Sequence, residues 1–162
     1  MQRGKADLGL LLVGMLWGLG FVFVKIGLNE GITPFYLLTI RFLVAFIILF
    51  AIFRSRLKNI EKSDLKNGFI IATFLFLGFA FQISGAALTT ASNNAFFTAI
   101  NVIIVPYIFW AIHKHVPNIF SFIAAGLCIL GVGVLSFDSK MQLNQLNEGD
   151  ILTIISALFF AR

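Results

Sequence analysis

Apolar stretches of about twenty residues alternate along the chain with short segments that carry most of its charged side chains. An α-helix rises ~1.5 Å per residue, so each stretch is long enough to cross the ~30 Å hydrocarbon core of a bilayer. The pattern therefore predicts a bundle of five transmembrane helices, at residues 8–28, 34–53, 67–88, 94–112 and 118–137.

A sixth apolar segment is shorter than the other five. It runs for 14 residues, from Gly149 to Arg162, which is too few to cross the hydrocarbon core. We expect a truncated sixth helix, so that the chain is a fragment. The predicted domains are a five-helix unit at residues 1–138 and the beginning of a second unit at residues 149–162.

The composition supports a bilayer as the medium in which the chain folds. Hydrophobic residues make up 59% of the sequence and charged residues 12%, whereas about a quarter of an ordinary soluble domain is charged. The net charge of +5 does not indicate a nucleic-acid partner, because five of the twelve basic residues gather in the loop between the second and third spans. The predicted fold class is an all-α membrane protein with the lipid bilayer as its first partner.

The distribution of lysine and arginine predicts how the chain is oriented. Cytoplasmic loops carry the excess of these residues. With the N-terminus inside, eight basic residues fall on the inner side and two, Lys25 and Lys140, on the outer side. We therefore expect a multi-pass protein with a cytoplasmic N-terminus. The eight inner residues are Arg3, Lys5, Arg54, Arg56, Lys58, Lys62, Lys66 and Lys114.

A short internal repeat links the first and the sixth apolar segments. An aspartate precedes each segment, and small and aromatic residues follow at equal distances, with a constant offset of 143 residues. Because a five-helix unit has an odd number of spans, a second copy would enter the membrane from the opposite face. The match predicts an inverted repeat, and its pairs are Asp7 with Asp150, Gly14 with Ala157, Trp17 with Phe160, and Gly18 with Ala161.

Polar and small residues recur at helical spacing inside the spans. Asn94, Thr98 and Asn101 share one face of the fourth span. Such a face either packs against a neighbouring helix or lines a path for a polar solute. Both interpretations stay open for Gln82 and Asn101, whereas Asn94 is expected to cap its helix. The third span carries the stripe Gly78, Gln82, Gly85 and Thr89, and packing is the expected role of Gly14, Gly18, Gly126 and Gly131.

Three large side chains inside the spans have more than one interpretation. Trp17 lies near the middle of the first span, so it either packs in the core or belongs to a stacking or gating site. Arg41, about two turns into the second span, either reaches the nearer surface or pairs with an anion or a carbonyl group inside the bundle. Lys25, near the outer end of its span, is expected to reach the surface.

The sequence offers little for catalysis or metal binding. His113 and His115 are the only histidines, and no cysteine or acidic residue is near them in sequence. Phosphate-binding, zinc and nucleophile motifs do not occur, and the single cysteine excludes an internal disulfide. No Asp or Glu lies deep within a complete span, where a proton carrier would be expected. We therefore expect neither an enzyme nor a cofactor or metal.

Several segments match, in order, a pattern known from one family of membrane proteins. They are LWGLGFVFVKIG at 16–27, RFLVA at 41–45, FAFQISGAAL at 79–88, TASNNAFFTAIN at 90–101, VP at 105–106 and GDILTIISALFF at 149–160. On these segments the chain resembles the EamA family of the drug/metabolite transporter superfamily. The resemblance implies ten helices in two inverted five-helix repeats, which carry amino acids, drugs or other metabolites across a bacterial inner membrane. His115 departs from the family, which often has a glutamate there, shortly before a proline.

The leading hypothesis is a transporter, or permease, that moves small organic solutes by alternating access between inverted repeats. The solute would lie in a cavity near the membrane midplane, and the partner would be the C-terminal repeat or a second copy of this chain. The alternative is a membrane scaffold or interaction protein, in which the same polar residues would be buried against neighbouring helices. The candidate cavity residues are Trp17, Arg41, Gln82, Thr98 and Asn101.

Overall fold

All regular elements in the described part of the chain are α-helices. In this computed structural model, the described residues are 2–55, 60–114, 118–136 and 147–161. The predicted fold class, an all-α membrane protein, is confirmed. The helices are α1 (Gln2–Asn29), α2 (Pro34–Phe53), α3 (Lys62–Leu88), α4 (Ala91–His113), α5 (Ile119–Ser136) and α6 (Glu148–Phe160).

Three of the helices, α1, α3 and α4, extend beyond the apolar segments from which they were predicted. The second segment matches α2 at both ends, whereas α3 begins five residues before its segment, at Lys62. Its first turn is polar and is held by a capping box, in which the backbone N–H of Glu61 donates to Asp64 Oδ2 at 3.1 Å. Hydropathy marks only the part of a helix that suits lipid, and a polar turn outside that part escapes it.

Three of the described helices are long and apolar enough to cross a membrane. They comprise the residues Ala6–Asn29, Pro34–Phe53 and Lys62–Leu88. That α4 and α5 also cross the membrane stays a prediction.

The break between α3 and α4 takes only two residues, Thr89 and Thr90. Both have extended backbone angles, and the Thr90 side chain accepts a hydrogen bond from the Asn93 backbone N–H at 3.1 Å. Thr90 is thus the N-cap of α4. The expectation that Asn94 caps this helix is wrong, because its side chain is directed into the bundle instead.

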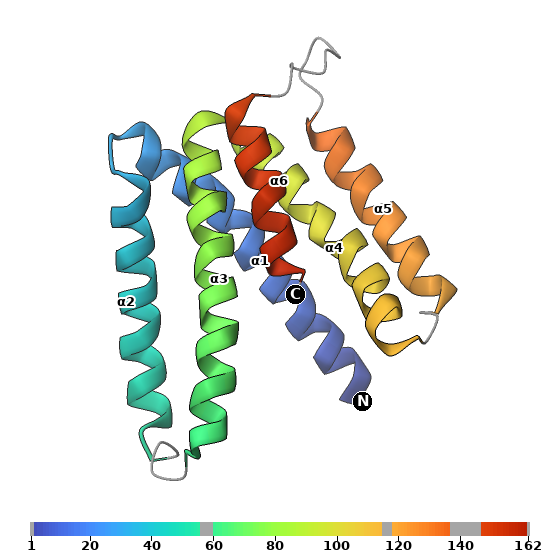
Figure 1. Cartoon of the computed structure of the whole chain (residues 1–162). Coiled ribbons are helices and arrows are strands. Elements are labelled where there is room, and N and C mark those ends of the chain that lie inside the picture. Colours follow the sequence, from blue (N-terminus) through green and yellow to red (C-terminus); the bar gives the residue numbers. More distant parts are fainter. Residues whose placement is uncertain (1, 56–59, 115–117, 137–146, 162) are drawn as a thin grey trace.

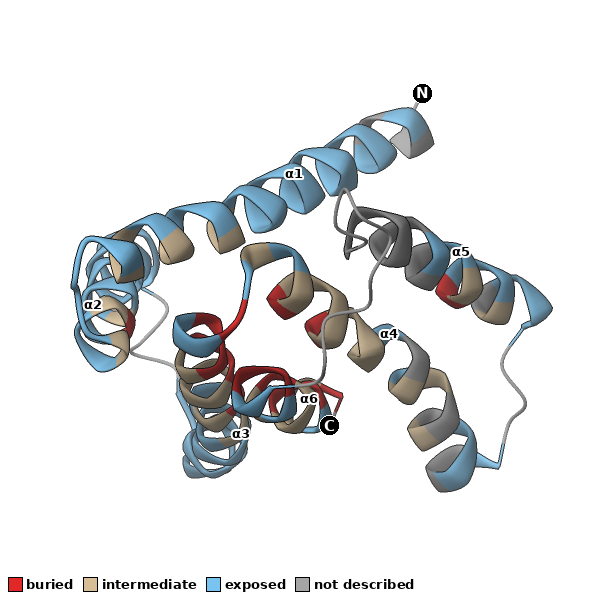
Figure 2. Ribbon diagram, turned by 90° about the horizontal axis from the view of Figure 1, so that it is seen from above, coloured by how far each residue is buried: buried red, intermediate tan, exposed pale blue. Residues whose placement is uncertain are grey.

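The short helix α6 lies between α3 and α4, although it comes last in the chain (Figure 1). Helix α5 packs on the far side of α4, and α2 packs on α3. Helix α1 runs obliquely across the bundle and contacts α3 and α4 (Figures 1 and 2). The first segment of the proposed second unit therefore packs against two helices of the first.

The buried core lies where α3, α4 and α6 meet, as the red segments in Figure 2 show. Ile83 of α3 and Asn94 of α4 are each 1% exposed, and Ala157 of α6 is fully buried. By contrast, α1 and α2 expose long series of large apolar side chains, including Leu10 at 71%. A water-soluble monomer rarely exposes so large an apolar surface, so lipid or further helices must cover it.

Candidate functional site

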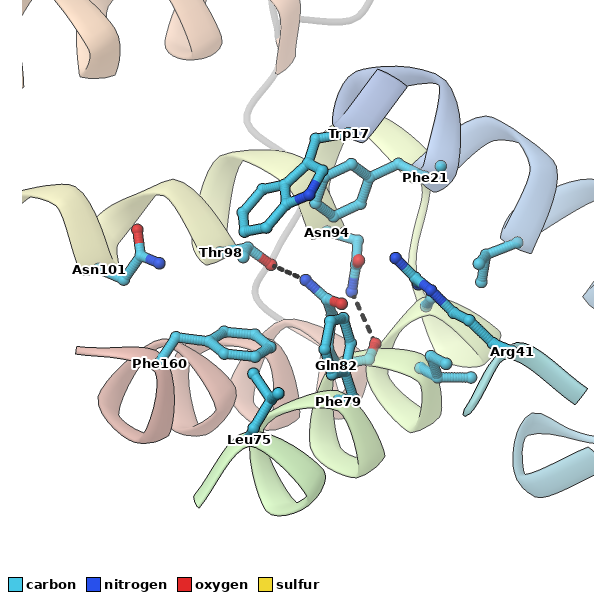
Figure 3. Close-up of a pocket in the computed structure, with 14 residues that line it drawn as sticks. Trp17, Phe21, Arg41, Leu75, Phe79, Gln82, Asn94, Thr98, Asn101 and Phe160 are labelled. Carbon is cyan, nitrogen blue, oxygen red and sulfur yellow. Dashed lines mark hydrogen bonds between the residues drawn. The ribbon is translucent and has the colours of Figure 1, made fainter. Parts of the chain in front are cut away.

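A cavity of about 190 Å³ lies between α1, α3 and α4, with α2 and α6 contributing one residue each (Figure 3). All five side chains that the sequence suggested for a cavity line it. They come from four different helices and are Trp17, Arg41, Gln82, Thr98 and Asn101. Their convergence is a geometric finding, whereas their role in binding a solute stays a prediction.

The polar wall of the cavity is a hydrogen-bonded group on α3 and α4. Gln82 Nε2 donates to Thr98 Oγ1 at 3.1 Å, and both side chains are buried. Asn94 Nδ2 donates to the Gln82 backbone carbonyl at 3.0 Å and to Thr153 Oγ1 of α6 at 2.8 Å. These bonds hold the amide groups in place beside the cavity, which is how polar groups are tolerated inside a membrane bundle.

Asn94 is a lining residue that the sequence analysis assigned to a different role. Helical spacing could have predicted this role, because Asn94 shares its helix face with Thr98 and Asn101. All three line the cavity. Its place in the fourth position after the N-cap concealed this, since asparagine is also common near helix starts.

Aromatic side chains form a large part of the remaining wall. Trp17 and Phe21 project from α1 on one side of the cavity, and Phe79 and Phe160 lie opposite (Figure 3). The rings of Phe79 and Phe160 meet edge to face, with centroids 5.1 Å apart. The sequence has 20 phenylalanines, so nothing distinguished Phe79 and Phe160 from those that face lipid.

Arg41 extends from α2 across the face of Phe79. The guanidinium carbon lies 4.7 Å from the centre of that ring, a distance at which a cation is attracted to the ring's π electrons. The side chain is directed toward the cavity that it lines (Figure 3). The residue as a whole is nevertheless exposed, and its described partner is a ring rather than an anion or a carbonyl group, so both roles considered for Arg41 stay open.

Lys25 binds the C-terminal end of α3. Its Nζ donates to the carbonyl oxygen of Ala86 at 2.8 Å and to that of Thr89 at 2.6 Å. The last carbonyl groups of a helix lack partners within the helix and attract a cation. That Lys25 lies near the membrane surface stays a prediction. Val24 and Ala86 line the cavity, so this contact joins α1 to α3 at one end of it.

The same end of the bundle is joined to α6. Thr89 Oγ1 donates to Asp150 Oδ1 at 2.6 Å, and Asp150 is only 1% exposed. Asp150 also accepts from the Asn147 backbone N–H at 3.1 Å, which forms the capping box of α6. Lys25, Thr89 and Asp150 thus connect α1, α3 and α6 in one polar cluster.

Helices α3 and α6 approach each other at a pair of glycines. A Cβ atom placed on Gly85 would lie 2.6 Å from the carbonyl oxygen of Gly149, and one on Gly149 would lie 2.7 Å from that of Gly85. A Cβ on Gly78 would meet the Phe160 ring at 2.6 Å. The stripe in α3 therefore has two functions. Its glycines allow α6 to pack closely, and Gln82 faces the cavity.

Three of the four glycines proposed for packing in the first and fifth spans lie on open faces of the described chain. A Cβ atom on Gly14, Gly18 or Gly126 would meet no described atom within 4 Å. The surroundings of Gly131 lie outside the described residues. That these four glycines pack against other helices stays a prediction. Among the described side chains, no group of three potential metal ligands comes together.

The comparisons with known proteins point to one family. The model of the EamA-like transporter family matches residues 4–137. Two curated relatives from Archaeoglobus fulgidus, each named "uncharacterized transporter", are 37% identical over 160 residues and 31% identical over 169 residues. Each alignment covers 99% of this chain, but 48% and 56% of the respective relative, so the chain spans about half their length. No solved structure matches the chain. The chain belongs to the EamA-like transporter family.

Proposed function

We propose that the chain carries small organic solutes, such as amino acids, drugs or other metabolites, across the cytoplasmic membrane, and that the cavity is the solute site. Membership of a transporter family supports a transport role. One observation carries the assignment of the site: polar and aromatic side chains from separate helices converge on the same cavity inside the bundle. Such a cavity, apolar with a few placed polar groups, is the usual form of a small-molecule site.

The proposed mechanism is alternating access between this five-helix unit and an inverted second unit, of which α6 is the first helix. Two findings support this mechanism: the internal repeat, and relatives that are about twice as long as this chain. Helix α6 already contributes Phe160 to the cavity. A solute between two inverted units becomes accessible from one side or the other as the units rock against each other.

The proposed orientation has the N-terminus in the cytoplasm, on the basis of eight basic residues inside against two outside. Two variants with one cysteine each, Ser55→Cys and Gly31→Cys in a Cys128→Ser background, would test this orientation in intact cells. A membrane-impermeant thiol reagent is expected to label the cysteine at position 31 only. If the cysteine at position 55 alone is labelled, the N-terminus lies on the outer side and the proposed orientation is wrong.

A transport assay tests the function directly. Protein purified in detergent is reconstituted into liposomes, and uptake of a panel of radiolabelled metabolites is measured. Gln82→Leu and Asn101→Leu remove hydrogen-bonding groups from the cavity and are expected to slow uptake of an active solute about three- to tenfold, as the loss of ~0.6–1.5 kcal/mol implies. The matched control is Val102→Leu, next to Asn101 but exposed on the outer surface.

A non-transporting scaffold is the second candidate, favoured by one observation. The hydrogen bond between Gln82 and Thr98 joins α3 to α4 and could serve packing alone. In that case no solute of the panel is taken up above protein-free liposomes. The two leucine variants would then differ from the unaltered protein in stability and in nothing else.

A further inference from the structure

The cavity carries one formal charge, and it is positive. Of the residues that line the cavity in the described part of the chain, only Arg41 is ionised at neutral pH. The other polar lining groups are the neutral side chains of Gln82, Asn94, Thr98 and Asn101. A cavity of this composition attracts an anion and repels a cation.

The guanidinium of Arg41 keeps its hydrogen-bonding capacity. Its described contact is the face of the Phe79 ring, at 4.7 Å, and no described residue forms a hydrogen bond or an ion pair with it. A ring covers one face of the guanidinium plane and leaves the N–H groups at its edge unaffected. Those five N–H groups form a planar fork that fits the two oxygens of a carboxylate.

The second cation near the cavity does not compete for such a ligand. Lys25 Nζ is held at 2.8 and 2.6 Å by the carbonyl oxygens of Ala86 and Thr89. An ammonium group has three N–H donors, and two of them are thereby engaged. Because Lys25 also does not line the cavity, Arg41 is the cation that a ligand carboxylate there would meet.

The remaining surface of the cavity fits an apolar, flat body. Trp17 and Phe21 lie across the cavity from Phe79 and Phe160, so that a ring or a short hydrocarbon chain would lie between aromatic side chains (Figure 3). The volume of about 190 Å³ is below the ~300–1,000 Å³ usual for drug-sized ligands. The ligand must be correspondingly small.

We propose that the cavity selects small organic monoanions, in which a carboxylate pairs with Arg41 and an apolar or aromatic body lies against Trp17 and Phe21. The amides of Gln82 and Asn101 are placed to bind a polar substituent on that body. This inference rests on the proposed function, since it assigns a ligand class to the same cavity. Arg41 is exposed, so its guanidinium can be reached by a ligand, and a charged group within a membrane span is favoured by an anionic partner.

Trp17 provides a direct readout of binding. The chain has two tryptophans, and Trp110 lies outside the cavity on the surface of α4. In the Trp110→Phe background, reconstituted in nanodiscs of neutral lipid, the fluorescence comes from Trp17, which lines the cavity and is 66% exposed. Three probes of nearly equal shape are titrated at pH 7: 3-phenylpropionate (anion), 3-phenylpropanol (neutral) and 3-phenylpropylamine (cation).

The anion is expected to bind at least tenfold more tightly than the alcohol, and the amine more weakly than both. Arg41→Gln should abolish the preference, while Arg41→Lys should keep part of it. The matched control is Arg54→Gln, which removes a charge at the exposed end of the same helix and should change nothing. If Arg41→Gln fails to fold, the comparison of probes in the unaltered cavity and the Arg41→Lys variant decide the question.

The outcomes separate this inference from the proposed function. Equal binding of the three probes overturns the charge selectivity but leaves a cavity that binds solutes. Preferred binding of the anion that persists in Arg41→Gln overturns the role of Arg41. If no probe changes the Trp17 fluorescence and no metabolite is taken up by liposomes, both the inference and the proposed function are wrong.

Discussion

The contact between α3 and α6 can be tested by adding one methyl group at Gly85. In Gly85→Ala, the new Cβ would lie 2.6 Å from the Gly149 carbonyl oxygen and 3.1 Å from the Thr153 amide nitrogen. Ordinary contact begins at 3.4 Å, so α6 would have to move away by about 0.8 Å. The Thr153 side-chain hydroxyl lies closer still, but these two partners are backbone atoms, which cannot rotate aside. Overpacking of this kind typically costs ~1–3 kcal/mol.

A matched control lies in the same helix. A Cβ atom on Gly68 of α3 would meet no described atom within 4 Å. Gly68→Ala and Gly85→Ala gain a similar helix propensity, up to ~1 kcal/mol in a helix interior, so their difference isolates the contact with α6. We expect Gly85→Ala to be less stable than Gly68→Ala by about 1–3 kcal/mol. Reversible unfolding in mixed micelles, followed by circular dichroism, measures this difference.

Equal stability of the two variants would refute the close approach of α3 and α6. Gly149→Ala provides an independent measurement from the opposite side, because its Cβ would lie 2.7 Å from the Gly85 carbonyl oxygen. If only one of the two glycines is sensitive, the helices meet elsewhere, and the position of α6 beside the cavity would need revision.

Three further substitutions test the polar contacts around the cavity. Lys25→Met removes two hydrogen bonds to the end of α3, and amide exchange at residues 85–90 should become faster, with Lys25→Arg restoring part of the protection. Asn94→Leu should destabilise the bundle by ~1–3 kcal/mol, because it leaves the Gln82 carbonyl without this donor. Thr89→Val should lower the free energy of unfolding by ~1–3 kcal/mol, because it removes a hydrogen-bond donor to buried Asp150. If Asn94→Leu or Thr89→Val unfolds like the unaltered protein, the contact that it removes does not stabilise the bundle.

The polar residues of the cavity could be predicted from the sequence because lipid makes them conspicuous. Gln82, Thr98 and Asn101 interrupt apolar helices, and a polar group in hydrocarbon must face the bundle interior. The periodicity of α4 places Thr98 and Asn101 on one face. That α1 and α2 would add Trp17 and Arg41 to the same cavity depended on helix packing, which periodicity alone does not determine.

The remaining features depend on contacts between distant segments. Lys25 binds carbonyl groups more than 60 residues away, at 2.6 and 2.8 Å, and only the position of the α3 terminus reveals this partner. The place of α6 between α3 and α4 likewise depends on Gly85 and Gly149 meeting, which neither residue indicates by itself. The same packing of α6 against α3 places Phe79 and Phe160 at the cavity. In so apolar a chain, the residue type alone does not predict which phenylalanines line a cavity.

The claim on which the function depends is that the space between α1, α3 and α4 is an open, solute-accessible cavity. Labelling of Asn101→Cys by a charged thiol reagent tests it most directly, in the Cys128→Ser background and in a bilayer. The matched control is Val102→Cys. Asn101 lines the cavity, whereas Val102 is on the outer surface of the same helix turn. We predict that the cysteine at position 101 is labelled and that a bound solute protects it, while that at position 102 is not labelled. A cysteine at position 101 as inert as that at position 102 would mean that these helices enclose a packed seam, and the chain would have no solute site there.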